Sequence, residues 1–155
     1  MTSVLEPRLV YHRNLPHWRL DGVTYFTTWR LDDRSGDLSP EDRSIVLQVL
    51  RYFRGRRYHL YACVVMDDHV HAIVRPFKDH TLSSIMHSWK SYSAHELNRR
   101  SHRTGQVWQH ESYDRIVRNT RDLWEKICYI QSNPQRRWPT LITYPWVWPP
   151  VDYGD

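Results

Sequence analysis

The segment from Val64 to Arg75 is an apolar run that carries two histidines one residue apart, His69 and His71. From His69 onward its β-branched residues are typical of a strand. Successive side chains of a strand point to opposite faces, so the two imidazoles share one face. The positions that would face the other way, into a core, are Val70, Ala72 and Val74. Two imidazoles aimed at one point are able to chelate a divalent metal ion.

The same pair has an ordinary interpretation, because ten histidines among 155 residues make a chance His-x-His pattern easy to obtain. His69 and His71 would then be surface or hydrogen-bonded side chains rather than ligands. Barrel amidohydrolases also carry His-x-His on a strand, but a TIM barrel typically needs about 250 residues and this chain is too short for one. Spacing alone leaves the metal-site and the structural interpretations open.

Length and composition predict one domain over residues 1–155, because the chain accommodates a single core and no Gly/Ser-rich linker divides it. The 22 Lys and Arg residues exceed the 17 Asp and Glu residues, and nearly all of the positive charge is arginine. Arginine binds phosphate bidentately and stacks on bases, and 8 Trp and 10 Tyr residues offer further stacking surfaces. This composition favours a phosphate-rich, nucleic-acid partner.

The sequence has no apolar run of membrane-spanning length, and residues 1–14 lack the hydrophobic segment of a signal peptide. We therefore expect a cytoplasmic, nucleoid-associated protein without a membrane partner. Cys63 and Cys128 each lie in an apolar pattern without Cys-x-x-Cys spacing, so both are expected to be reduced core residues.

The pattern of the chain predicts an irregular N-terminal arm over residues 1–20 and a Pro/Trp-rich tail without regular structure over residues 138–155. Alternating and apolar segments predict strands at residues 23–31, 58–66, 69–75 and 113–118. Ser39 as N-cap begins a helix over residues 40–54, and helical spacing predicts a second over residues 82–98. A last helix is expected from Asn119 or Thr120 to Asn133, before Pro134. The βαββαβα order favours an α/β (α+β) domain, an antiparallel sheet with helices on one face.

The last predicted helix carries two polar residues, Tyr129 and Asn133, four positions apart on one face. Its buried stripe is formed by Leu123, Ile127 and Ile130. If the helix presents its polar face to the two histidines, it supplies a phenol nucleophile and an oxygen ligand for a metal. Alternatively, Tyr129 is a half-buried packing residue and Asn133 ends the helix before proline. Spacing does not decide between these interpretations.

A resemblance to a known family bears on that choice. Residues 65–71 (Val-Met-Asp-Asp-His-Val-His) resemble the histidine-hydrophobe-histidine signature of HUH single-strand nucleases. Residues 24–28 resemble the first strand of the single-tyrosine transposases, and residues 107–109, 113–118 and 129–134 resemble their REP-associated (RAYT) branch. The match covers about residues 22–138, and its order and spacing are more specific than any single motif. On this resemblance the chain is identified as a member of the RAYT branch.

The resemblance implies a ferredoxin-like fold and cleavage of single-stranded or hairpin DNA, in which a tyrosine attacks a phosphodiester and stays joined to the 5′ phosphate. Tyr129 matches the nucleophile, His69 and His71 match the metal-binding pair, and Asn133 matches the third, polar ligand. The implied metal is Mg²⁺ or Mn²⁺, which would polarise the phosphate. A returning 3′ hydroxyl would rejoin the strands. The family pattern leaves open a monomer or a homodimer in which Tyr129 acts in trans.

Two features depart from the family pattern. Asp67 and Asp68 replace the Pro-Asn or Pro-Glu common before the histidines, which would either tighten metal binding or merely make a turn. His110 and Glu111 offer an additional ligand or acid-base group, although a loop histidine is more often a simple polar contact.

The charge alone also fits a second function, a non-catalytic module that grips structured single-stranded or hairpin DNA, or RNA, without cutting it. A third, weaker alternative is a metal-dependent phosphoesterase that acts on another nucleic acid. The candidate DNA-binding residues are arginines: Arg54, Arg56, Arg57, Arg99, Arg100, Arg115 and Arg118.

Overall fold

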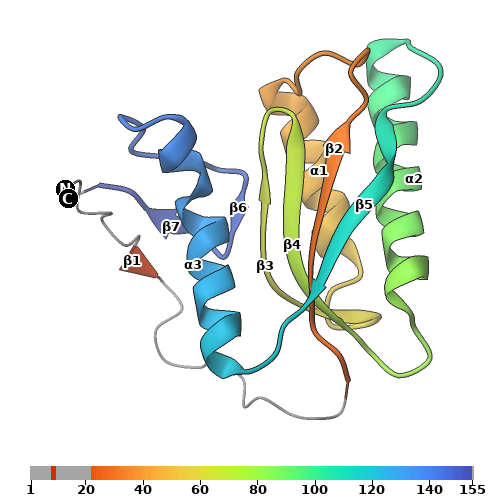
Figure 1. Cartoon of the computed structure of the whole chain (residues 1–155). Coiled ribbons are helices and arrows are strands. Elements are labelled where there is room, and N and C mark those ends of the chain that lie inside the picture. The colour runs from red at the N-terminus through yellow and green to blue at the C-terminus, as the bar shows by residue number, and fades with distance from the viewer. Residues whose placement is uncertain (1–7, 10–21, 155) are drawn as a thin grey trace.

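The computed structural model of the chain describes residues 8–9 and 22–154. Its elements are β1 (Arg8–Leu9), β2 (Tyr25–Leu31), α1 (Pro40–Tyr52), β3 (Tyr58–Val65), β4 (His69–Pro76), α2 (Leu82–Ser101), β5 (Trp108–Ile116), α3 (Thr120–Arg137), β6 (Val147–Trp148) and β7 (Val151–Asp152). From β2 to α3 the order is βαββαβα, as predicted (Figure 1). Apart from β1, the N-terminal arm expected over residues 1–20 lies outside the described residues.

The centre of the fold is a five-stranded sheet in the order β5-β2-β4-β3-β6, in which every neighbouring pair is antiparallel. A separate two-stranded sheet pairs β1 with β7. The predicted α+β architecture with an antiparallel sheet is therefore confirmed. The histidine strand β4 lies in the middle of the sheet, between β2 and β3, so its backbone is held on both sides.

Helices α1 and α2 cover one face of the sheet. The side chains that meet there include Val46, Leu50, Ile85, Trp89, Val70, Ala72 and Val74. The predicted inward orientation of the residues that alternate with the histidines is thus confirmed. Cys63 lies in the same cluster as a buried thiol. Because β4 is fixed by this packing, His69 and His71 must project from the other face.

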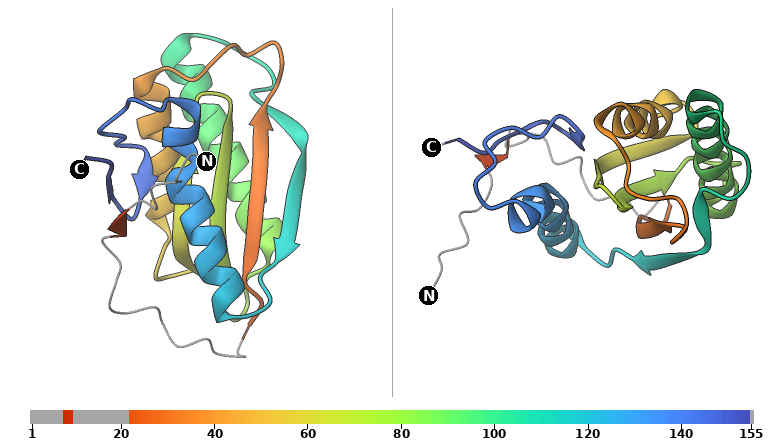
Figure 2. Two further views of the ribbon diagram at one scale, coloured as in Figure 1. Left: turned by 60° about the vertical axis from the view of Figure 1, so that its left-hand side comes forward. Right: turned by 90° about the horizontal axis from the view of Figure 1, so that it is seen from above.

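Helix α3 packs on that other face, so the prediction of helices on one face holds for α1 and α2 and is corrected for α3. Its apolar stripe meets β3 and β4 in a second core cluster, which includes Leu123, Ile127, Ile130, Val64 and Ile73. Figure 2, seen from above, places α3 apart from α1 and α2, across the sheet. The physical reason is that β3 is buried on both of its faces, so each face needs a cover.

Helix boundaries follow their capping residues at the N-termini and differ from expectation at the end of α3. Ser39 forms a capping box with Asp42 at the start of α1, and Asn119 accepts from the backbone of Asp122 at the start of α3. The predicted stop before Pro134 is wrong, because α3 continues to Arg137 with this proline inside it. A proline removes one helical hydrogen bond, but its ring is buried here, and an ion pair of Arg137 with Asp67 ties the last turn to the turn between β3 and β4.

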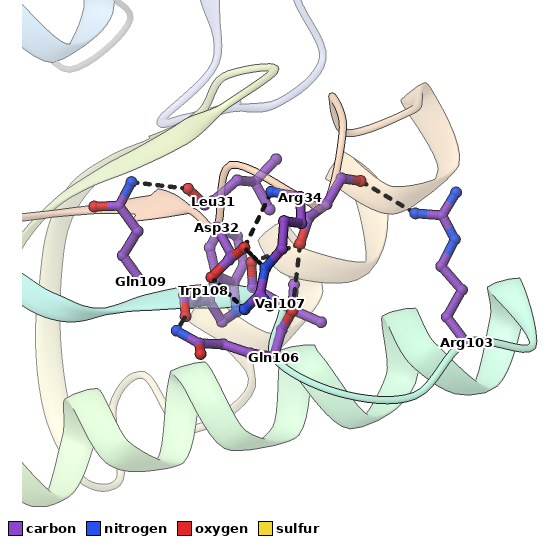
Figure 3. A network of polar contacts seen from close by, with 9 residues as sticks. Leu31, Asp32, Arg34, Arg103, Gln106, Val107, Trp108 and Gln109 are labelled. Carbon is purple, nitrogen blue, oxygen red and sulfur yellow. Dashed lines mark hydrogen bonds and ion pairs between the residues drawn. The ribbon is translucent and has the colours of Figure 1, made fainter.

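Strand β5 begins at Trp108, five residues before the predicted start at Tyr113. Its register against β2 shifts between Trp29 and Leu31, and such a bulge hides the alternating pattern. Figure 3 shows the polar contacts that hold this irregular start, where the Gln109 side chain donates to the Leu31 carbonyl at 3.1 Å. The motif around residues 107–109 therefore anchors β5 to β2.

The C-terminal tail contains two short strands, which corrects the prediction that residues 138–155 lack regular structure. β6 pairs with β3 and β7 pairs with β1. The four prolines of the tail flank these strands rather than interrupt them. Tyr144 and Tyr153 donate to the carbonyls of Val65 and Gln131, so the tail holds α3 against β3.

Candidate active site

The two histidines of β4 and a tyrosine of α3 lie together on the α3 side of the sheet. The ring centroids of His69 and His71 are 4.7 Å apart, and the Tyr129 ring lies 5.5 Å from that of His71. Phe26 of β2 lies beside both His71 and Tyr129, at 5.4 and 5.9 Å. Tyr129 is 39% exposed, so its ring is packed while one side stays open to solvent. The structure brings the predicted nucleophile and the predicted histidine pair to one place.

Each histidine has a partner at its Nδ1 atom. The Asp68 carboxylate lies 2.6 Å from Nδ1 of His69, and the Thr28 hydroxyl lies 2.7 Å from Nδ1 of His71. A carboxylate only accepts, so Nδ1 of His69 donates to it. When Nδ1 of His71 likewise donates to Thr28, the neutral form of each ring presents an unprotonated Nε2, and this is the arrangement in which neighbouring groups orient metal-binding imidazoles.

Burial keeps His71 neutral. Its residue is 6% exposed, and loss of solvent lowers the pKa of its imidazole to about 3, with further contributions from the neighbouring His69, Arg30 and Arg136 side chains. An imidazole with so low a pKa is a poor proton acceptor near neutral pH, because it holds the transferred proton weakly. It is well suited to act as a neutral ligand, since metal binding requires the unprotonated ring.

The position of Asn133 follows from how α3 runs beside β4. Arg137 contacts Asp67 at 2.7 Å in the turn before β4, whereas Tyr129 lies beside His71. Residue numbers rise along α3 from the histidine toward this turn, whereas along β4 they rise from the turn toward the histidine, so α3 and β4 run in opposite directions. Asn133 is half-buried and lies on α3 one helical turn after Tyr129, in the direction of the turn before β4.

The side chains gathered at this site fit a divalent cation with open coordination positions. Among the described residues, no cluster of three or more His, Cys, Asp or Glu side chains is placed to hold a metal ion. The candidate ligands are the two imidazoles, with the amide oxygen of Asn133 as the candidate third ligand. Such a set leaves positions for water or substrate oxygens, as catalytic metal sites do.

One guanidinium group lies against the tyrosine and another lies beside the histidine pair. The guanidinium of Arg136 lies 4.6 Å from the centroid of the Tyr129 ring and donates to the Ser132 hydroxyl at 2.7 Å. Arg30 is exposed on β2, opposite His69 in the register of β2 and β4. A phosphate that reached the tyrosine would lie near the guanidinium group of Arg136, which suits its charge and geometry.

Several of these neighbours were missed when the sequence was read alone. Phe26, Thr28 and Arg30 alternate along one strand, but only the pairing of β2 with β4 puts them beside the histidines. The position of Arg136 beside Tyr129 was predictable, because Arg136 follows Tyr129 by seven residues, a spacing that returns to the same helical face.

The seven arginines predicted to bind DNA lie in three separate places. Those in the turn between α1 and β3 stack on neighbouring aromatic rings: Arg54, Arg56 and Arg57. Arg99 and Arg100 lie at the end of α2 and pair with acidic residues of α2 and α1. Arg115 lies on β5 and Arg118 in the link to α3. Of the seven, Arg115 shares the histidine face, because it is paired with Phe26 across the sheet.

The residues that depart from the family pattern, Asp67, Asp68 and His110, lie in different places. Asp68 orients His69, and Asp67 is a buried carboxylate that pairs with Arg137. His110 lines a hollow of about 430 Å³ with residues of α2, on the opposite side of the sheet from the candidate site. It therefore does not join the histidine pair.

The fold and this site define a class of protein. A family model described as "Transposase IS200 like" matches residues 21–132, and the chain belongs to this family. It is 26% identical to a REP-associated tyrosine transposase of Escherichia coli K12 over 117 residues, which are 74% of this chain and 68% of that protein. The predicted resemblance to REP-associated transposases is confirmed. A second relative of this description, from Haemophilus influenzae, is 24% identical over 139 residues, 81% of this chain and 77% of the relative.

Two solved structures have the same fold. A REP-associated tyrosine transposase bound to a REP hairpin superposes with a TM-score of 0.67 at 23% identity, covering 85% of this chain and 79% of its own. A transposase from Deinococcus radiodurans R1 superposes with a TM-score of 0.54 at 21% identity, covering 76% of this chain and 95% of its own. Within residues 22–154, no helix is long and apolar enough to span a membrane.

Proposed function

We propose that this IS200-like transposase is a single-stranded DNA endonuclease and strand transferase that cleaves and rejoins DNA at hairpin-flanked sites. The observation that carries the proposal is the position of Tyr129, 5.5 Å from His71 between ring centroids and beneath the Arg136 guanidinium. A hairpin substrate is supported by the similar solved transposase, which is bound to a REP hairpin. Tyr129 and His71 belong to the same chain, so we propose that the tyrosine acts in cis.

In the proposed reaction the hydroxyl oxygen of Tyr129 attacks the phosphorus of a phosphodiester. The bond from phosphorus to the 3′ oxygen breaks, the 5′ phosphate stays on the tyrosine, and the phenol proton ends on the departing 3′ oxygen. One phosphate diester is exchanged for another, so no water is consumed. A 3′ hydroxyl that returns to the phosphotyrosine reverses the step and joins two strands.

His69, His71 and Asn133 would hold Mg²⁺ or Mn²⁺. When bound, such an ion polarises the phosphate and stabilises the leaving oxygen. The chain contributes the rest: Asp68 and Thr28 orient the imidazoles, and burial keeps His71 unprotonated. Arg136 would hold the phosphate near the phenol and balance the negative charge that develops on it.

Incubation of the protein with hairpin DNA that carries single-stranded flanks, in the presence of Mn²⁺, tests the proposal. An SDS-resistant adduct between protein and DNA is the expected result. Cleavage without an adduct would instead favour a metal-dependent phosphoesterase. Binding without cleavage would favour the non-catalytic binding module, and either of these outcomes overturns the proposed chemistry.

A further inference from the structure

The sheet face that carries the histidines is covered over one half only. Helix α3 packs on β3 and β4. On the other half, every residue of β5 from His110 to Ile116 is exposed. Thr28 and Phe26 of the neighbouring strand β2 are half-buried. An open strip of sheet therefore runs alongside the candidate active site, from β4 across β2 to the edge strand β5 (Figure 1).

Cross-strand register places particular side chains on this strip. Tyr113 of β5 is opposite Thr28 of β2, which is in turn opposite His71 of β4. Residues directly opposite one another in antiparallel strands point to the same face, so these three side chains form a row. Neighbouring strands are about 4.8 Å apart, so the Tyr113 backbone lies about 10 Å from that of His71. Arg115 lies in the next row, opposite Phe26.

The intervening residue of β5 confirms which way the strand faces. Asp114 accepts a hydrogen bond from Thr27 at 2.6 Å, and the Thr27 hydroxyl also contacts the Met86 sulfur on the α2 side. Because Asp114 faces α2, its two neighbours Tyr113 and Arg115 must face the histidine side.

The chemistry of these two residues suits a single strand of nucleic acid. The Tyr113 side chain is large and mostly apolar, yet the residue is 62% exposed. The guanidinium of Arg115 lies 5.5 Å from the centroid of its ring. An exposed ring offers a stacking surface to a base, and an adjacent guanidinium binds the phosphate that follows it. Bases in a duplex are already stacked on one another, so this arrangement selects unpaired nucleotides.

We propose that Tyr113 and Arg115 form a platform for the unpaired nucleotides that flank the scissile phosphate, with Tyr113 stacking on a base and Arg115 binding the backbone. The proposal rests on the proposed function, because it takes the DNA to be cut at Tyr129. The platform lies in line with His71, so a strand that crosses the sheet from β5 arrives at the nucleophile. Single-stranded DNA is thereby the partner of the β2–β5 half of the sheet.

The test is binding of a DNA hairpin whose single-stranded flank contains 2-aminopurine, a base that loses fluorescence when it stacks. Tyr113→Ala should weaken binding of this probe about tenfold and abolish the quenching. Tyr113→Phe keeps the ring, so it should retain the quenching and bind within about twofold of the natural protein. Tyr92, 59% exposed on α2, provides the matched control, and Tyr92→Ala should behave like the natural protein.

A hairpin without a flank should bind equally to all four proteins, because it leaves the platform empty. The proposal is overturned if Tyr113→Ala binds the flanked probe as tightly as the natural protein does. It is also overturned if Tyr113→Phe loses as much affinity as Tyr113→Ala. The same holds if Tyr113→Ala loses as much affinity for the hairpin without a flank as for the flanked hairpin. Adduct formation by the natural protein is scored separately. A protein that forms no adduct but loses flank binding in Tyr113→Ala contradicts the proposed chemistry and supports the platform.

Discussion

Replacement of His71 by asparagine should remove a large part of the acid sensitivity of the fold. His71 is 6% exposed, and its pKa falls from 6.5 to about 3 on folding, chiefly because of burial. As the pH falls from about 7 to about 5, the unfolded chain gains a proton at this position while the folded protein does not. Stability is therefore full above the unfolded pKa and is lost as the pH falls toward 3. Each pH unit below the unfolded pKa of 6.5 costs about 1.4 kcal/mol of stability, so the loss by pH 5 is about 2 kcal/mol.

Urea unfolding at pH 7 and at pH 5, with EDTA present to keep metal ions away, measures this loss. Asparagine keeps a polar group near the Thr28 hydroxyl but does not titrate, so His71→Asn should lose about 2 kcal/mol less than the natural protein over this range. Burial also lowers the pKa of His59, but this residue is present in both proteins, so its contribution to the acid sensitivity cancels in the comparison. His87→Asn, at an exposed position of α2, controls for the removal of a histidine. Equal acid sensitivity in His71→Asn and the natural protein would refute the assignment of a buried neutral imidazole.

Three further predictions concern the metal, the helix and the DNA. His69→Ala should lower the rate of DNA cleavage in Mg²⁺ by about 100-fold, with partial rescue by Mn²⁺. Asn133→Ala should lower cleavage by about tenfold, as measured across a metal titration. Full activity of His69→Ala with chelator present would contradict the metal site. Arg137→Ala should lower the free energy of unfolding by about 1–2 kcal/mol, because it leaves the buried Asp67 carboxylate without its ion-pair partner. Adding Asp67→Asn to this variant should recover part of the lost stability, as measured by urea unfolding. Binding of flanked hairpin DNA should weaken steeply with salt, by a slope of about 0.9 for each phosphate contacted in duplex, and a flat salt dependence would contradict phosphate binding.

Much of the sheet and of the histidine pair was predictable from local pattern. The alternation of His69 and His71 with valine and alanine identified the buried face of β4, because a strand has a period of two. Ser39 marked the start of α1 because its side chain caps the first turn. These features depend on neighbours in the sequence, which is why the sequence alone revealed them.

Features that depend on distant pairing were not predictable in the same way. Thr28 meets His71 only because β2 lies beside β4, and no local signal specifies that neighbour. The strands of the tail form because β3 and β1 offer them edges. The continuation of α3 past Pro134 depends on burial of the proline and on the ion pair of Arg137 with Asp67, so tertiary contacts outweigh the local preference.

The identity of the residue joined to DNA tests the central claim most directly. Protease digestion of the adduct formed on flanked hairpin DNA, followed by mass spectrometry, should place the nucleotide on the peptide that contains Tyr129. Tyr129→Phe should bind the same DNA and form no adduct, since it lacks one oxygen and keeps the ring that packs against Phe26 and His71. An adduct that persists in Tyr129→Phe, or one that maps to Tyr113, would contradict the account.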